Sequence, residues 1–205
     1  MTASTDKRSI PVTLATQDPV PVYDKLRGII GEVLVMTGAE LPGQVPLIDA
    51  HDSDSVRHIL GSIRELSVKG DMLRGVAYFA SKQAAQEAYT DAKEGHLTDV
   101  SIGARRLAEF YIEKGESRTY GSTVVKGPAR IVTRWRPVEG SPVPIGADSR
   151  STFDRTLEVR RFLCGLGMPR EYLYNEVQAI EWAKRNTTMR NAKTRKPSVT
   201  ARRGY

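Results

Sequence analysis

The chain is poor in the side chains that cross-link proteins or bind metals. It has one cysteine in 205 residues, Cys164, which excludes an internal disulfide and a cysteine-rich metal site. The three histidines are His51, His58 and His96, and none has the HExxH or a similar ligand spacing. We therefore expect no metal and no organic cofactor, and we expect a reducing compartment.

Long apolar runs are also missing. The longest run near the start, residues 29–36, is interrupted by Gly31 and Glu32, and no stretch approaches the ~20 apolar residues of a membrane span. Lys7 and Arg8 are not followed by an apolar segment, so we expect no signal peptide and no membrane contact. Apolar residues still make up 40% of the chain, which is enough for a buried core.

Acidic residues are absent from the C-terminal end. Residues 184–205 contain eight Lys or Arg and no Asp or Glu, so this tail accounts for the net charge of +7 and the rest is close to neutral. No aromatic residues alternate with these cations, which argues against specific single-strand recognition. Any contact of the tail with nucleic acid is expected to be non-specific, through phosphate charge. Such a tail is usually a solubilising or disordered end, and the alternatives are a segment that targets the acidic scaffold and a region of self-cleavage.

Strand-like patterns dominate residues 20–151, with one helix among them. Ser81 is a candidate N-cap for a helix over 82–93, which Gly95 ends. A hairpin is predicted from 64–68 into 72–79. The other expected strands are 29–36, 45–50, 56–63, 98–102, 107–112, 120–125, 129–136 and 142–145.

This order predicts an α+β fold with a mostly antiparallel, barrel-like sheet and a helix shortly before the strand that carries Ser101. Apolar periodicity in the last quarter predicts C-terminal helices. We expect a flexible segment over 1–19 with a short strand at 10–15, a main domain over 20–151, a helical appendage over 152–186 and a disordered basic tail over 187–205. The appendage would pack on the main domain, or serve in scaffold docking or oligomerisation.

Three short segments supply the side chains of a serine-nucleophile site. Val45–Asp52 contains His51, Leu97–Ala104 contains Ser101, and Trp135–Asp148 contains Glu139. A serine hydroxyl needs a nearby imidazole to take its proton, and the imidazole needs an acceptor on its other nitrogen. Composition alone does not say that these residues meet in space.

The amino-acid sequences of these segments, and their order along the chain, resemble motifs of the prohead proteases of tailed bacteriophages. That family has a herpesvirus-assemblin-like fold. The segment 46–52, followed by Ile59-Leu-Gly-Ser, resembles the family's histidine segment. The segment 97–104 resembles its nucleophile segment, and 137–148 is similar to its closing motif. The resemblance covers roughly residues 25–155. Gly140 and Pro142 depart from the strand-favouring residues expected there, and Pro142 indicates a sheet edge or a bulge.

The resemblance implies a serine endopeptidase in which His51 is the general base, Ser101 the nucleophile and Glu139 the acid that orients His51. His58 remains an alternative base. Arg105 and Arg106, together with backbone N–H groups, are candidates for stabilising the oxyanion. Asp148, Asp99 and Asp52 remain alternative acids.

By the same resemblance the enzyme acts inside the assembling prohead, in the host cytoplasm. Its substrates would be the scaffold or the N-terminal segment of the major capsid protein, and also the enzyme itself. The family resemblance also allows a homodimer. A rival hypothesis is a catalytically inactive scaffold or capsid-assembly protein with the same domain, and a third is a basic-tailed protein associated with nucleic acid.

Overall fold

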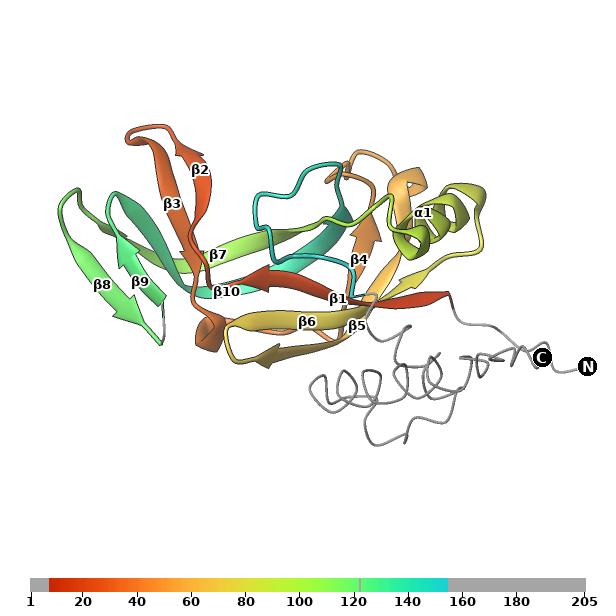
Figure 1. Ribbon diagram of the computed structural model, residues 1–205, viewed down its shortest axis with the longest axis horizontal. Helices are drawn as coiled ribbons and strands as arrows, with labels where there is room; N and C mark the ends of the chain where they lie inside the picture. The colour runs from red at the N-terminus through yellow and green to blue at the C-terminus, as the bar shows by residue number, and fades with distance from the viewer. Residues whose placement is uncertain (1–7, 122, 155–205) are drawn as a thin grey trace, which may run out of the picture. The chain divides into compact units, whose positions relative to one another are not determined.

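The computed structural model describes residues 8–121 and 123–154 (Figure 1). Of the helical appendage expected over 152–186, only residues 152–154 are described, and Thr152 and Phe153 form isolated β-bridges with Asp99 and Val12. The rest of the appendage and the basic tail expected over 187–205 lie outside the described residues. The elements are β1 (Ser9–Thr16), β2 (Val20–Asp24), β3 (Gly28–Leu34), η1 (Met36–Gly38), β4 (Gln44–Ile48), η2 (Val56–His58), β5 (Ile59–Lys69), β6 (Met72–Phe79), α1 (Gln83–Glu94), β7 (Val100–Ile112), β8 (Ser117–Tyr120), β9 (Thr123–Lys126) and β10 (Ala129–Pro142).

The main sheet is open and mixed, so the expectation of a barrel-like sheet is corrected. Seven of its strands follow the order β1-β6-β5-β4-β10-β3-β2. The eighth strand, β7, is not part of this path and pairs with β10. The end strands β1 and β2 do not pair with each other in this path, so the sheet does not close. The pairing of β10 with β3 and β4 is parallel, whereas that with β7 is antiparallel. An α+β fold dominated by its sheet is confirmed.

The main domain begins before residue 20, the boundary expected from the sequence. Ile10, Val12 and Leu14 of β1 are buried in the main core, and the strand pairs with β6 along its length. The predicted strand at 10–15 is therefore an integral part of the sheet, and the flexible segment predicted over 1–19 does not extend through residues 9–16.

The predicted hairpin and helix are present. β5 pairs antiparallel with β6, and α1 ends at Gly95, whose φ of 92° is the left-handed conformation that glycine adopts readily. The predicted cap is wrong, because the N-cap residue is Lys82 and no side chain caps the helix. Ala85 and Ala92 of α1 are buried in the main core.

β7 and β10 are each longer than the sequence pattern predicted. The strands expected at 98–102 and 107–112 are one strand, and those at 129–136 and 142–145 are replaced by one that ends at Pro142. Register shifts fall at Leu107 of β7 and at Thr133 and Val138 of β10, where one strand has an extra residue. Each extra residue breaks the alternation of faces, so a continuous strand resembles two short ones in the sequence.

Gly140 is a packing requirement of the core. A Cβ on Gly140 would lie 2.4 Å from Ile63 Cδ1 and 2.8 Å from Leu14 Cδ2, and both of these side chains are buried. The departure from an apolar strand residue at this position therefore has a steric reason. β10 crosses the core where there is no room for a side chain.

A buried ionic cluster lies between β2, β3, β7 and β10. Arg130 of β10 contacts Asp24 at 2.6 Å and Glu32 at 2.8 Å, and the Tyr111 hydroxyl donates a hydrogen bond to Asp24. The backbone N–H of Leu26, then Tyr111 and Arg130, hold the pKa of Asp24 at about 2 against the opposing effect of burial, compared with its ordinary 3.8. The Asp24 carboxylate is thus ionised in the folded protein well below the pH at which it titrates in the unfolded chain.

This pKa difference predicts a specific sensitivity to acid. Because the pKa of Asp24 is lower in the folded state, its contribution to stability is fully present above about pH 4 and is lost as the pH falls from 3.8 towards about 2. We expect Asp24→Asn to be less stable than the wild type at pH 7, with the difference shrinking towards pH 2. Urea unfolding at both pH values measures this difference, and a constant difference would contradict the prediction.

Candidate active site

A bulge in β10 sets the direction of Glu139. Pro137 pairs with Ala104 and Glu139 pairs with the next residue of β7, Gly103, so Val138 is the extra residue. Without a bulge, Pro137 and Glu139 would point to the same side of the sheet. The bulge instead leaves Pro137 buried and turns Glu139 to the opposite face, which is also the face of Ser141.

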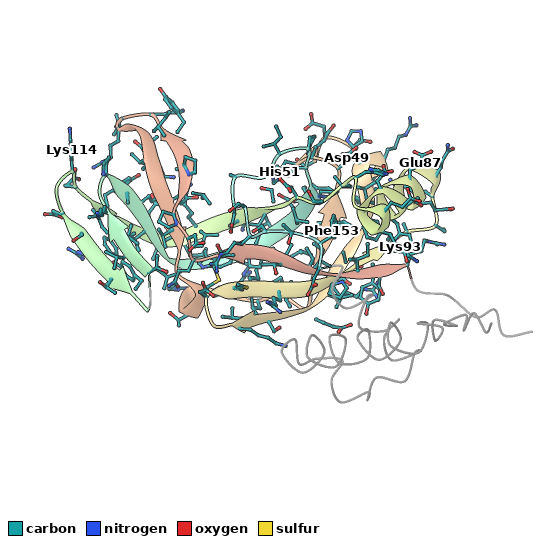
Figure 2. All side chains as sticks on the ribbon, viewed as in Figure 1. Asp49, His51, Glu87, Lys93, Lys114 and Phe153 are labelled. Carbon is teal, nitrogen blue, oxygen red and sulfur yellow. The ribbon has the colours of Figure 1, made fainter. Side chains whose placement is uncertain are left out.

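His51 lies in a tight turn directly after β4 (Figure 2). Ala50 and His51 both have left-handed φ angles, 43° and 64°, and the Asp52 N–H donates to the Asp49 carbonyl at 2.7 Å. Two consecutive positive φ angles with this hydrogen bond are the pattern of a type I′ turn, which Asn and Gly normally fill. The Ala50 N–H also donates to the Pro142 carbonyl at 3.2 Å, which ties the turn to the end of β10. The strained turn therefore holds His51 over β10.

His51, Glu139 and Ser141 form a hydrogen-bonded cluster. His51 Nδ1 lies 2.6 Å from Glu139 Oε1. The Ser141 hydroxyl donates to Glu139 Oε2 at 2.7 Å and accepts a hydrogen bond from the His51 backbone N–H at 3.1 Å. Ser141 is fully buried, whereas the His51 side chain is 42% exposed. One carboxylate is thus fixed between an accessible imidazole and a buried hydroxyl.

The Glu139 carboxylate lies against Gly103 of β7. A Cβ on Gly103 would be 2.2 Å from Glu139 Oε1 and 2.9 Å from its Cδ. Oε1 is the same oxygen that contacts His51, so the imidazole lies close to this part of β7. The absence of a side chain at Gly103 leaves the space in which the pair meets.

Ser101 lies on the same face of β7, two residues before Gly103 and directly opposite Ser141 of β10. Strand geometry puts the Cα atoms of Ser101 and Gly103 about 6.6 Å apart. In the described part of the chain the Ser101 hydroxyl makes no hydrogen bond to His51. The serine also lines a different cavity, of about 270 Å³, from the hollow that His51 and Glu139 line. The structure therefore brings His51 and Glu139 into contact and leaves Ser101 nearby on the same face, without contact.

The two arginines considered for the oxyanion lie on opposite faces of β7. Arg106 shares the face of Ile102 and Ala104 and pairs with Glu32 at 3.0 Å, so it is not positioned to reach an oxyanion at Ser101. Arg105 lies on the face of Ser101, but four residues farther along the strand, which corresponds to about 13 Å between Cα atoms.

The alternative acids and base have other partners. Asp148 accepts hydrogen bonds from the Thr16 N–H and hydroxyl at 2.7 and 2.8 Å, and Asp99 accepts from the Gly146 N–H at 2.9 Å. Asp52 lies 2.9 Å from Nδ1 of His58, which forms a second histidine–carboxylate pair. Among the carboxylates considered, only Glu139 pairs with His51 in the described part of the chain.

Two contributors to this geometry were not recognised from the sequence. Ser141 lies within the segment 137–148 that resembles the closing motif, and the spacing Glu139-x-Ser141 alone places both side chains on one face of a strand. Gly103 follows Ser101 by two residues, which likewise puts it on the face of the serine. No sequence pattern indicates that Glu139 lies over this glycine, because that depends on the register between β7 and β10.

Comparison of the chain with protein-family models, curated proteins and solved structures found no match. Among residues 8–121 and 123–154, no group of His, Cys, Asp and Glu has the arrangement of a metal site. Over the same ranges, no helix is long and apolar enough to cross a membrane. The geometry of the site and the resemblance of its three segments are therefore the grounds for assigning a function.

Proposed function

We propose that this protein is a serine endopeptidase of the phage prohead protease type, with Ser101 as nucleophile, His51 as base and Glu139 as orienting acid. The observation that carries the proposal is the 2.6 Å contact between His51 Nδ1 and Glu139 Oε1, with Ser101 on the same face of the neighbouring strand. Three segments far apart in the sequence supply these side chains in the order expected for that family. The scaffold and the major capsid protein are the proposed substrates, and the prohead interior is the proposed location.

The contacts of His51 suit it to proton transfer. A hydrogen bond from Nδ1–H to Glu139 favours the tautomer whose Nε2 accepts a proton, and the carboxylate stabilises the imidazolium that results. Nε2 takes the proton of Ser101 as Oγ bonds to the substrate carbonyl carbon. The proton then passes to the leaving amine as the C–N bond breaks. Water, deprotonated by His51, hydrolyses the resulting ester and regenerates Ser101.

Ser101 is a better candidate nucleophile than Ser141, although Ser141 contacts Glu139 directly. Ser141 is fully buried and its hydroxyl proton is engaged by Glu139 Oε2, so no substrate carbonyl can reach it in this arrangement. Ser101 is only partly buried and its hydroxyl is free of hydrogen bonds within the described residues. We assign Ser141 the role of a positioning residue, which fixes the Glu139 carboxylate and the His51 backbone.

A fluorophosphonate ester tests the nucleophile without knowledge of the substrate. The expected result is a single adduct on the full-length protein, mapped to Ser101 by peptide mass spectrometry, because only an activated serine attacks the phosphorus atom and displaces fluoride. His51→Ala removes the base and should abolish labelling. Labelling at another serine, or labelling that persists in His51→Ala, would refute the assignment.

An inactive assembly protein with the same domain is the second candidate function. The observation that favours it is the separation of Ser101 and His51 into two cavities without a hydrogen bond. Catalytic hydrogen bonds are often long in unliganded enzymes, which is why the protease is preferred. Absence of any fluorophosphonate adduct, together with intact capsid and scaffold proteins after co-expression, would favour the inactive protein.

A further inference from the structure

An open hollow of about 510 Å³ lies against the His51–Glu139 pair, and both residues line it. Much of the rest of the lining is apolar and comes from separate elements. Val56 belongs to η2, Ile59 begins β5, and Val138 is the bulged residue of β10. The hollow is within the size range of sites that bind small groups.

The apolar side chains around this hollow are unusually accessible. Val56 is 82% exposed, Val138 40% and Ile59 39%, whereas the apolar core residues are almost fully buried. Single exposed apolar residues are common on protein surfaces. Three of them around one hollow, beside a polar pair with catalytic geometry, form a surface that releases water when an apolar group enters.

The charges around the hollow disfavour acidic and basic side chains. No Lys or Arg is among its lining residues within the described part of the chain, so an acidic group would have no partner there. Glu139 is the carboxylate in the lining, and both of its oxygens are engaged, by His51 and by Ser141. A basic group would therefore have to compete for a carboxylate that the site already uses.

We propose that this hollow binds a large apolar side chain (Leu, Met or Phe) of the peptide that the protein cleaves. The proposal rests on the protease function proposed above. Ser101 does not line the hollow. The hollow adjoins the His51–Glu139 pair, so the bound side chain belongs to a residue near the cleaved bond.

Binding is tested without catalysis, using the full-length Ser101→Ala protein with methyl-labelled Val and Ile. The probes are N-acetyl-leucine amide and N-acetyl-lysine amide. We expect the leucine amide to shift the methyl resonances of Val56, Ile59 and Val138 saturably, and the lysine amide to leave them unchanged. Val56→Asp should weaken leucine amide binding about tenfold. Val124→Asp is the matched control, because Val124 is 59% exposed on β9 and does not line the hollow.

Specificity is tested with a mixture of peptides from a digested proteome, cleaved by the wild-type protein and analysed by mass spectrometry. We expect Leu, Met or Phe to be enriched at one fixed position near the cleaved bond. The enrichment should fall about tenfold in Val56→Asp and persist in Val124→Asp.

The outcomes separate this proposal from the proposed function. Ser101-dependent cleavage without an apolar preference, or with a preference that Val56→Asp leaves intact, would overturn the hollow as a specificity site and leave the protease standing. Absence of saturable methyl shifts would also overturn it. Methyl shifts without any Ser101-dependent cleavage would support an apolar binding site but refute its role in proteolysis.

Discussion

Ser101→Ala is expected to abolish proteolysis while leaving the fold intact. Without its hydroxyl the protein cannot form the acyl-enzyme, and loss of a triad nucleophile typically lowers kcat by about 10⁴-fold or more. The substituted side chain is smaller and Ser101 makes no side-chain hydrogen bond within the described residues, so the free energy of unfolding should change little. Intact mass spectrometry after co-expression with the cognate capsid or scaffold protein measures the loss of cleavage products.

Ser149→Ala provides the matched control for this experiment. Ser149 is an exposed serine in the segment after β10, and the same substitution there should leave the products unchanged. Fragments with the wild-type masses in Ser101→Ala would remove Ser101 from the mechanism. Loss of cleavage in both variants would point to a general effect on the protein.

Gly103→Ala is expected to reduce activity by about 10²- to 10⁴-fold, the range reached when the orienting acid of a triad loses its function. The added Cβ would lie 2.2 Å from Glu139 Oε1, and this oxygen is held by its contact with His51. The carboxylate must move, so the His51–Glu139 contact is broken although neither residue is replaced. The loss should appear in kcat, because the substituted glycine reaches substrate only through Glu139 and His51.

Gly31→Ala is the control for adding a methyl group to a strand glycine. A Cβ on Gly31 would lie 3.5 Å from its nearest neighbour, an ordinary contact, so activity should be retained. The proton on His51 Nδ1 gives a second readout, since its downfield NMR resonance should be present in the wild type and Gly31→Ala and lost in Gly103→Ala. Wild-type activity in Gly103→Ala would contradict the orienting role of Glu139.

Local features of the fold were predictable because neighbouring residues determine them. The hairpin of β5 and β6 follows from alternating apolar residues around a turn, and α1 ends where Gly95 permits a positive φ. The pairing of His51 with Glu139 was expected from the resemblance of their segments. Its geometry was not, since it depends on the turn at Ala50 and on the hydroxyl of Ser141.

Features that depend on distant contacts were missed. The openness of the sheet depends on which strands lie at its ends, and no local pattern states that β1 and β2 do not meet. The strand β1 was assigned to a flexible segment because its partner β6 is about 60 residues away in the sequence. Arg106 was considered for the oxyanion from its proximity to Ser101 in the sequence, whereas alternation along β7 turns it to the other face.

The bulge at Val138 makes the number of residues in β10 as important as their identity. Residues before the bulge are in one phase of the strand and residues after it are in the other, so Trp135 and Gly140 both face the core although an odd number of steps separates them. Keeping Val138 but pairing the strands without a bulge would exchange the faces of everything that follows and send Glu139 into the core, whereas deleting Val138 itself would leave Pro137 and Glu139 on opposite faces. In distant relatives, a residue missing at Val138 would therefore leave the acid on its present face, whereas a one-residue gap between Glu139 and Ser141 would put these two side chains on opposite faces.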